Sequence, residues 1–140
     1  MKDKIIRLSK IISHAGICSR REAEQLIDNC KVEINVKIYN EYTIRNDIIK
    51  TIVVSGEALK KNVNRLWIFN KPVGYVSSNK EQKNQKSLFR LFPSYIPRVV
   101  TVGRLDIMSE GLIIITNNPS ISSFLETPKN NIKRKYLVNV

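Results

Sequence analysis

The sequence has few of the residues on which metal sites and disulfide scaffolds depend. It contains two cysteines, Cys18 and Cys30, and a single histidine, His14. A structural zinc site needs about four ligands, so these three residues are too few. Two cysteines without a secretory signal also indicate a reducing compartment, in which both remain free thiols. We therefore expect neither a metal site nor a disulfide scaffold.

Long apolar runs are missing as well. No stretch reaches the roughly 18 apolar residues that a membrane span requires. The segment from Met1 to Ser13 is interrupted too often by lysine and arginine to form the apolar part of a signal peptide. We therefore expect a cytoplasmic protein with no membrane partner.

Acidic residues are half as numerous as basic ones. The chain has 12 Asp and Glu against 24 Lys and Arg, which gives a formal net charge of +12. This excess predicts a polyanionic partner, with nucleic acid favoured over a membrane surface. Hydrophobic residues make up 42% of the chain, which excludes a disordered protein. The 140 residues are enough for one medium domain or two small ones.

Two helical patterns lie between Arg7 and Cys30. Gly16 ends the first pattern as a C-cap glycine would, and Ser19 begins the second as an N-cap, with Glu22 completing a capping box. Apolar residues at three- and four-residue steps give each helix one buried face, formed by Ile5, Leu8, Ile11, Ile12 and Ala15 in the first and by Ala23, Leu26 and Ile27 in the second.

Short strands follow the two helices. Val32, Ile34 and Val36 alternate with polar residues, and a second alternating strand is expected from Thr51 to Val54, ending at Ser55-Gly56. The segment from Glu57 to Arg65 is polar and basic without periodicity, which predicts a linker between two domains.

The segment RLSKIISHAGICSRREAEQLIDNCKVEIN resembles the αL RNA-binding motif named after ribosomal small-subunit protein four. The resemblance implies that Ser19, Arg20 and Arg21 present polar and basic groups to structured RNA, and we add Arg7 and Lys10 to this set. A helix N-terminus also favours phosphate. The alternative is an ordinary solvated helix end.

One departure from the αL motif concerns its turns. Glycines usually flank the first strand of the motif, and this chain has Cys30 and Val36 there. The missing glycines bear on the tightness of these two turns more than on RNA binding.

The second half of the chain begins with the expected buried strand Leu66–Asn70. Pro72 and Gly74 then set a turn before a strand from Tyr75 to Ser78. Further along we expect a mobile loop from Lys80 to Lys86 and then a short helix capped by Ser87, with Phe89, Leu91 and Phe92 in the core. A strand is expected at Val99–Val102 and a helix from Pro119. The last predicted element is a basic strand, Lys133–Val140.

The most informative stretch is Gly103–Asn118, in which a polar loop precedes a strand. The β-branched, apolar run from Leu112 to Thr116 predicts a strand buried on both faces or a central strand. Gly103 and Gly111 permit unusual backbone angles at the loop ends. The loop displays Arg104, Asp106, Ser109 and Glu110. The alternative to a functional loop is a local ion pair between Arg104 and Asp106, or a turn hydrogen bond from Asp106 or Ser109.

The stretch GRLDIMSEGLIIITNN resembles the signature loop of the RsuA/RluB-type ribosomal RNA pseudouridine synthases, and NKPVGYVSS resembles their first motif. The resemblance implies that Asp106 is the catalytic nucleophile of a uridine isomerisation that needs no cofactor and no metal. Arg104 would fill the space of an extruded base or keep Asp106 ionised. Tyr136 would pack on the target base, with a buried or cross-strand tyrosine as the alternative. We also expect Lys71 to bind RNA.

Together these observations predict an α+β protein. Residues 1–63 would form a small αL RNA-binding domain of two helices and short strands, and residues 64–140 the N-terminal part of a mixed, mainly antiparallel synthase sheet. The enzyme would act on ribosomal RNA, with the large subunit favoured. Family members continue for about another hundred residues, so we expect the sheet to be incomplete and a complementary C-terminal polypeptide to be a partner. The alternatives are an inactive RNA-binding module and, more distantly, a DNA-binding helix-turn-helix protein.

Overall fold

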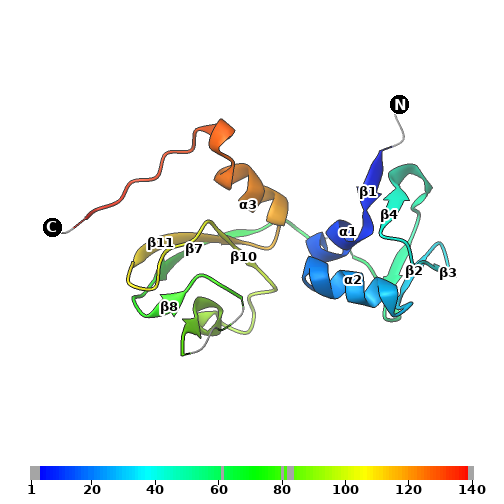
Figure 1. The fold of residues 1–140 in the computed structure, drawn as a ribbon, viewed down its shortest axis with the longest axis horizontal. Helices are drawn as coiled ribbons and strands as arrows, with labels where there is room; N and C mark the ends of the chain where they lie inside the picture. The colour runs from blue at the N-terminus through cyan, green and yellow to red at the C-terminus, as the bar shows by residue number, and fades with distance from the viewer. Residues whose placement is uncertain (1–3, 61, 80, 82–83, 139–140) are drawn as a thin grey trace. The chain divides into compact units, whose positions relative to one another are not determined.

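A computed structural model describes residues 4–60, 62–79, 81 and 84–138 (Figure 1). The chain divides into two compact units, Met1–Val63 (unit 1) and Asn64–Val140 (unit 2). Both units combine helices with mainly antiparallel strands, so the predicted α+β fold class is confirmed. None of the helices in these ranges has the length and apolar character needed to cross a membrane.

Unit 1 contains the two predicted helices, α1 (Leu8–His14) and α2 (Arg20–Asp28). Gly16 follows α1 with a φ of 83°, as expected of a C-cap glycine. The capping box at α2 is also confirmed. The Ser19 amide donates to the Glu22 carboxylate over 2.7 Å, and the Glu22 amide donates to the Ser19 hydroxyl over 3.3 Å.

The apolar stripe predicted for the first helix begins too early. Ile5–Arg7 forms strand β1, which pairs antiparallel with β4 (Thr43–Arg45), and the Ile5 side chain is exposed. The partner strand lies about 40 residues away in sequence, and such a distant pairing leaves no mark on a local helical pattern.

Four short strands form an antiparallel sheet in the order β3-β2-β5-β6. These are β2 (Val32–Ile34), β3 (Lys37–Ile38), β5 (Ile52–Val54) and β6 (Glu57–Ala58). Two predictions need correction. Val36 lies in the turn between β2 and β3, and the first residues of the predicted linker form β6. Residue 61 of that linker lies outside the described residues. A short 3-10 helix, η1 (Asn46–Ile48), follows β4.

The two turns in which Cys30 and Val36 replace the usual glycines have a left-handed backbone. Cys30 has a φ of 55°, Asn35 of 51° and Val36 of 69°. This conformation is a true outlier for a β-branched residue such as valine. The turns are therefore as tight as glycine would make them, at a cost in backbone strain.

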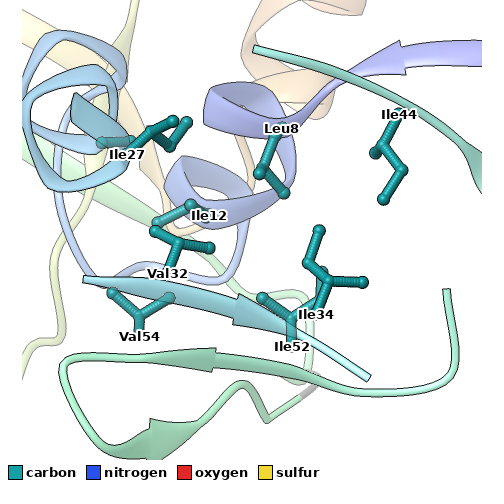
Figure 2. Packing of buried hydrophobic residues seen from close by; sticks show 9 residues of the cluster. Leu8, Ile12, Ile27, Val32, Ile34, Ile44, Ile52 and Val54 are labelled. Carbon is teal, nitrogen blue, oxygen red and sulfur yellow. The ribbon is translucent and has the colours of Figure 1, made fainter. Parts of the chain in front are cut away.

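The core of unit 1 is a single apolar cluster between the helices and the strands (Figure 2). Residues from α1 and α2 point toward residues from β2, β4 and β5. The fully or nearly fully buried members are Leu8, Ile12, Ala23, Ile27, Val32, Ile34, Ile44, Ile52 and Val54.

Unit 2 is built on a three-stranded antiparallel sheet in the order β10-β11-β7, formed by Val100–Val102, Gly111–Thr116 and Leu66–Lys71. The predicted central position of the Leu112–Thr116 strand is confirmed. Its burial is one-sided, however. Ile113 and Ile115 are buried opposite Phe69 and Trp67, whereas Leu112 on the other face is 66% exposed.

The remaining elements of unit 2 are short. β8 (Tyr75–Val76) and β9 (Lys86–Ser87) form a parallel pair, and Ser87 caps the 3-10 helix η2 (Leu88–Leu91) as predicted. Phe92 packs edge-on against Phe69, with ring centroids 4.9 Å apart. Leu91, in contrast, is exposed, and Leu88 is the buried residue of this turn. Of the predicted loop from Lys80 to Lys86, residues 80, 82 and 83 lie outside the described residues.

Helix α3 (Pro119–Glu126) packs on β10 and β11 and is followed by the 3-10 helix η3 (Pro128–Asn130). The strand predicted for Lys133–Val140 is not formed over residues 133–138, which have no regular secondary structure. Residues 139 and 140 lie outside the described residues. A strand needs a partner for its backbone groups, and none of the described strands pairs with this segment.

Candidate active site and nucleic-acid interface

The loop that carries Asp106 joins two neighbouring strands of the sheet in unit 2. It leaves β10 at Gly103, with a φ of 75°, and enters β11 at Gly111, with a φ of 117°. A β-carbon added at either position would meet no described atom within 4 Å. Both glycines are therefore required by backbone conformation rather than by close packing.

The side chains of Arg104 and Asp106 are both exposed. Within the described part of the chain, the structure shows no ion pair between them and no hydrogen bond to the Asp106 carboxylate. The turn bond of this loop is instead made by the backbone, where the Ser109 amide donates to the Asp106 carbonyl over 3.0 Å. The alternative of a loop ion pair is thus absent, and the carboxylate faces solvent.

Lys71 lies beneath this loop. The side chain is fully buried, and its ammonium donates to the carbonyls of Pro72, Asp106 and Ser109 over 3.1, 3.0 and 2.6 Å. Burial lowers the pKa of Lys71, because desolvation disfavours the charged form, and the negative charge of Asp106 opposes this shift. The Lys71 side chain has no exposed surface in this structure, and its role in RNA binding stays a prediction.

Two further residues hold the same loop from the segment after β7. The Ser77 hydroxyl accepts from the Leu105 amide over 3.0 Å and donates to the Leu105 carbonyl over 2.9 Å. The Gly74 amide donates to the Ile107 carbonyl over 2.8 Å. Sequence reasoning did not identify Ser77, because nothing in a serine after a short strand indicates a partner 28 residues away.

The predicted RNA-binding residues of unit 1 lie on its surface. Arg7, Lys10, Arg20 and Arg21 are exposed. Lys10 of α1 and Arg20 of α2 both act on His14, whose pKa is lowered first by burial and then by these two positive charges. The structure therefore brings cations of both helices to one neighbourhood. Ser19 is half-buried, and its hydroxyl serves the capping box.

Tyr136 belongs to the segment without secondary structure and is exposed. The adjoining residues 131–134 line a hollow of about 540 Å³ together with residues 125–128 at the end of α3. None of the lining residues belongs to the Asp106 loop. The structure thus does not place Tyr136 in a buried or cross-strand position.

No group of three or more His, Cys, Asp and Glu side chains in the described ranges is arranged to hold a metal ion. The charged groups at the loop are the exposed carboxylates of Asp106 and Glu110, the exposed guanidinium of Arg104 and the buried ammonium of Lys71.

Comparison with protein families gives two matches. Residues 65–140 match the model of the RNA pseudouridylate synthase family, and residues 6–44 match the model of the S4 domain.

Several curated proteins are similar over nearly the whole chain. An uncharacterized RNA pseudouridine synthase of Rickettsia felis is 41% identical over 133 residues, covering 94% of this chain and 58% of the relative. Ribosomal large subunit pseudouridine synthase B of Bacillus subtilis is 33% identical, covering 96% of this chain and 55% of the relative. A crystal structure of a pseudouridylate synthase aligns with a TM-score of 0.48 and 25% identity, covering 89% of this chain and 54% of that chain. The chain spans between half and six tenths of the length of these proteins.

Proposed function

Because the chain belongs to the RNA pseudouridylate synthase family, we propose that it isomerises a uridine of ribosomal RNA to pseudouridine. The name of the Bacillus subtilis relative supports a large-subunit RNA as substrate. We assign RNA binding to residues 1–63, which include the S4 match, and catalysis to residues 64–140. The observation that carries the proposal is the solvent-facing Asp106 carboxylate on a loop whose backbone is fixed by Lys71, Gly74 and Ser77.

The reaction suits a single carboxylate. The bond between ribose and the uracil nitrogen breaks, the base rotates, and a ring carbon bonds to the sugar. The ring carbon then loses its proton and the nitrogen gains one, so the overall composition does not change. Asp106 acts as the nucleophile, or as a base, at the sugar or the ring. Within the described residues the Asp106 carboxylate accepts no hydrogen bond, so its oxygens are available for this role.

Arg104 acts on the RNA. A uridine inside a folded RNA must leave its stack before Asp106 can reach it, which costs a few kcal/mol. The exposed guanidinium of Arg104 lies two residues from Asp106 and makes no ion pair with it in the described structure. It can therefore bind a phosphate or occupy the space of the extruded base. Tyr136 is exposed and can stack on the target base when RNA is bound.

The cations of unit 1 provide RNA affinity. Lys10 and Arg20 lie near one another through their common neighbour His14, and Arg21 lies in the first turn of α2. Arg7, before α1, is exposed as well, and exposed cations of this kind suit a phosphate backbone.

Asp106→Asn tests the catalytic proposal. The purified chain is incubated with ribosomal RNA fragments, and pseudouridine is mapped chemically. We expect the variant to lose at least about 10³-fold in rate, because the amide is no nucleophile. Glu110→Gln removes the same charge from an exposed position of the same loop and should stay within a few-fold of the parent. Equal losses in both variants would reject Asp106 as the nucleophile.

Arg20→Ala combined with Arg21→Ala tests the binding proposal. Loss of two phosphate contacts should weaken RNA binding and flatten the slope of log affinity against log salt by about two. The matched control removes two exposed lysines of the same unit, Lys37 and Lys50. An equal change in both double variants would indicate a general charge effect instead of a defined surface.

An RNA-binding module without turnover is the second candidate, and one observation favours it. Ile68 is 72% and Leu112 is 66% exposed on one face of the sheet in unit 2, so that face has little cover among the described residues. RNA retention without pseudouridine formation would support this candidate. We propose that a complementary polypeptide covers this apolar face, and activity that appears only when such a polypeptide is added would identify it as a required partner.

A further inference from the structure

Lys71 is the only buried charged side chain among the described residues. Burial of an ammonium group is costly unless its hydrogens find strong acceptors. No carboxylate of the described chain lies within ion-pair distance of it. Its acceptors are three backbone carbonyls, and an ammonium group has three hydrogens to donate. The full donor capacity of the side chain is therefore used to hold backbone.

Two of the three carbonyls belong to the loop that carries the residue proposed as nucleophile. One belongs to Pro72, directly after Lys71, and the others belong to Asp106 and Ser109, at the two ends of a turn. The Asp106 carbonyl also accepts from the Ser109 amide over 3.0 Å. Both acceptor positions of this oxygen are occupied, so the peptide group that follows Asp106 is fixed on two sides.

We propose that Lys71 is a positioning residue, whose ammonium sets the orientation of the Asp106 carboxylate through the loop backbone without touching RNA. This inference rests on the proposed function, because it gives Lys71 a purpose in the same reaction. It also explains why a cation occupies this site. A neutral side chain of similar length would leave the carbonyls of Pro72, Asp106 and Ser109 without their donor.

The kinetic test replaces Lys71 by methionine, which has a similar length and no donor. A nucleophile displaced by about 1 Å loses roughly 10²-fold in rate. We expect Lys71→Met to lower kcat by about 100-fold and to leave the KM for the RNA within about two-fold. Lys129→Met removes the same charge from an exposed site of unit 2 and should retain the parental kcat. An unchanged kcat, or a raised KM with an unchanged kcat, would overturn the proposal.

A second measurement does not depend on activity or on the folding of a variant. In the parental protein, the Lys71 side chain and the amides of Leu105 to Ser109 are followed by NMR as the pH is raised from 8. If the ammonium holds the loop, these amides should shift with the same midpoint as the side chain, with Asp106 as the charged group that acts on it. Loop amides whose NMR shifts do not follow the Lys71 titration would overturn the proposal, even if Lys71→Met were unfolded.

The two measurements also separate this inference from the proposed function. Parental protein that forms no pseudouridine but shows the common midpoint would reject the synthase activity and retain Lys71 as the residue that holds the loop. Parental protein that forms pseudouridine but lacks the common midpoint would support the synthase activity and reject Lys71 as the residue that holds the loop.

Discussion

The two units of the molecule are held together in different ways. Unit 1 has one apolar cluster to which both α-helices and three of its strands contribute. The buried polar side chains among the described residues of unit 1 are those of Ser9 and Ser13. Unit 2 buries fewer apolar side chains, namely Leu88, Val99, Ile113 and Ile115, and more polar ones, namely Lys71, Ser87, Thr116, Asn117 and Ser122.

This difference agrees with the proposed roles of the two units, RNA binding for unit 1 and catalysis for unit 2. A surface that presents cations needs only a stable support, and an apolar core provides one with little geometric detail. A loop that presents one carboxylate needs a defined backbone, and hydrogen bonds are directional. Unit 1 should therefore respond most to lost packing, and unit 2 to the loss of single hydrogen bonds.

The largest expected effect is in the core of unit 1. Ile27→Ala removes a fully buried side chain and should lower the free energy of unfolding by about 2–5 kcal/mol. The same change at Ile68, which is 72% exposed in unit 2, should cost no more than about 1 kcal/mol. Hydrogen exchange of the amides of residues 20–28 reports the first change, and fluorescence of Trp67, the only tryptophan, reports the second. Equal losses in the free energy of unfolding for Ile27→Ala and Ile68→Ala would contradict the proposed difference between the two units.

The next effect concerns a single hydroxyl group in unit 2. Thr116 is fully buried, donates to the Arg65 carbonyl over 2.7 Å and accepts from the Asn118 amide over 3.1 Å. Thr116→Val keeps the shape, but the Asn118 amide loses this acceptor and the Arg65 carbonyl keeps only the Asn117 amide, at 3.3 Å. The change should cost about 1–3 kcal/mol in denaturant unfolding followed by Trp67 fluorescence. Thr101→Val, in the neighbouring strand β10, is the matched control. A neutral Thr116→Val would show that unit 2 does not depend on this bond.

A smaller effect, with the opposite sign, is expected at a strained turn of unit 1. Val36→Gly should raise the free energy of unfolding by about 0.5–1 kcal/mol, because glycine adopts the observed φ of 69° without a β-carbon clash. Val63→Gly, at an exposed position without a positive φ, should be neutral or slightly destabilising. Chemical denaturation of both variants provides the measurement. Destabilisation by Val36→Gly would mean that the side chain, 86% exposed, contributes more than its strain costs.

The smallest effect is a pH dependence of unit 1. Burial and the charges of Lys10 and Arg20 lower the pKa of His14 in the folded protein from the usual 6.5. The unfolded chain therefore binds a proton at a higher pH than the folded one, and the free energy of unfolding should decrease as the pH falls below about 6.5. His14→Gln should remove this decrease. Asp47, whose pKa is lowered by Arg45, acts only below its usual value of 3.8 and does not interfere.

Local sequence signals predicted the parts of the fold that depend on neighbouring residues. The capping box of Ser19 and Glu22, the glycine after α1 and the cap at Ser87 each involve groups a few residues apart. The central position of β11 could be predicted as well from its apolar run, although the burial of both faces that such a run also suggests is not found, since Leu112 is exposed.

Distant pairing accounts for one prediction that was wrong, because Ile5–Arg7 forms a strand beside Thr43–Arg45, far along the chain. Glu57–Ala58 pairs with the nearby β5, and its polar sequence showed no local sign of a strand. Lys71 carries a charge that suggests a surface position, and only the contact with Asp106, 35 residues later, shows why it is buried. The loop around Asp106 was identified by its motif, whereas the groups that hold it could not be. The catalytic role of Asp106 remains a prediction.

The register between β7 and β11 limits how this loop can change in length. Lys71 lies directly opposite Gly111, the last residue of β7 against the first of β11. An added residue between Asp106 and Gly111 could not be absorbed by sliding β11, because a slip of one position would exchange the buried Ile113 and Ile115 for Leu112 and Ile114. Insertions and deletions that shift β11 against β7 should therefore not be tolerated in this loop.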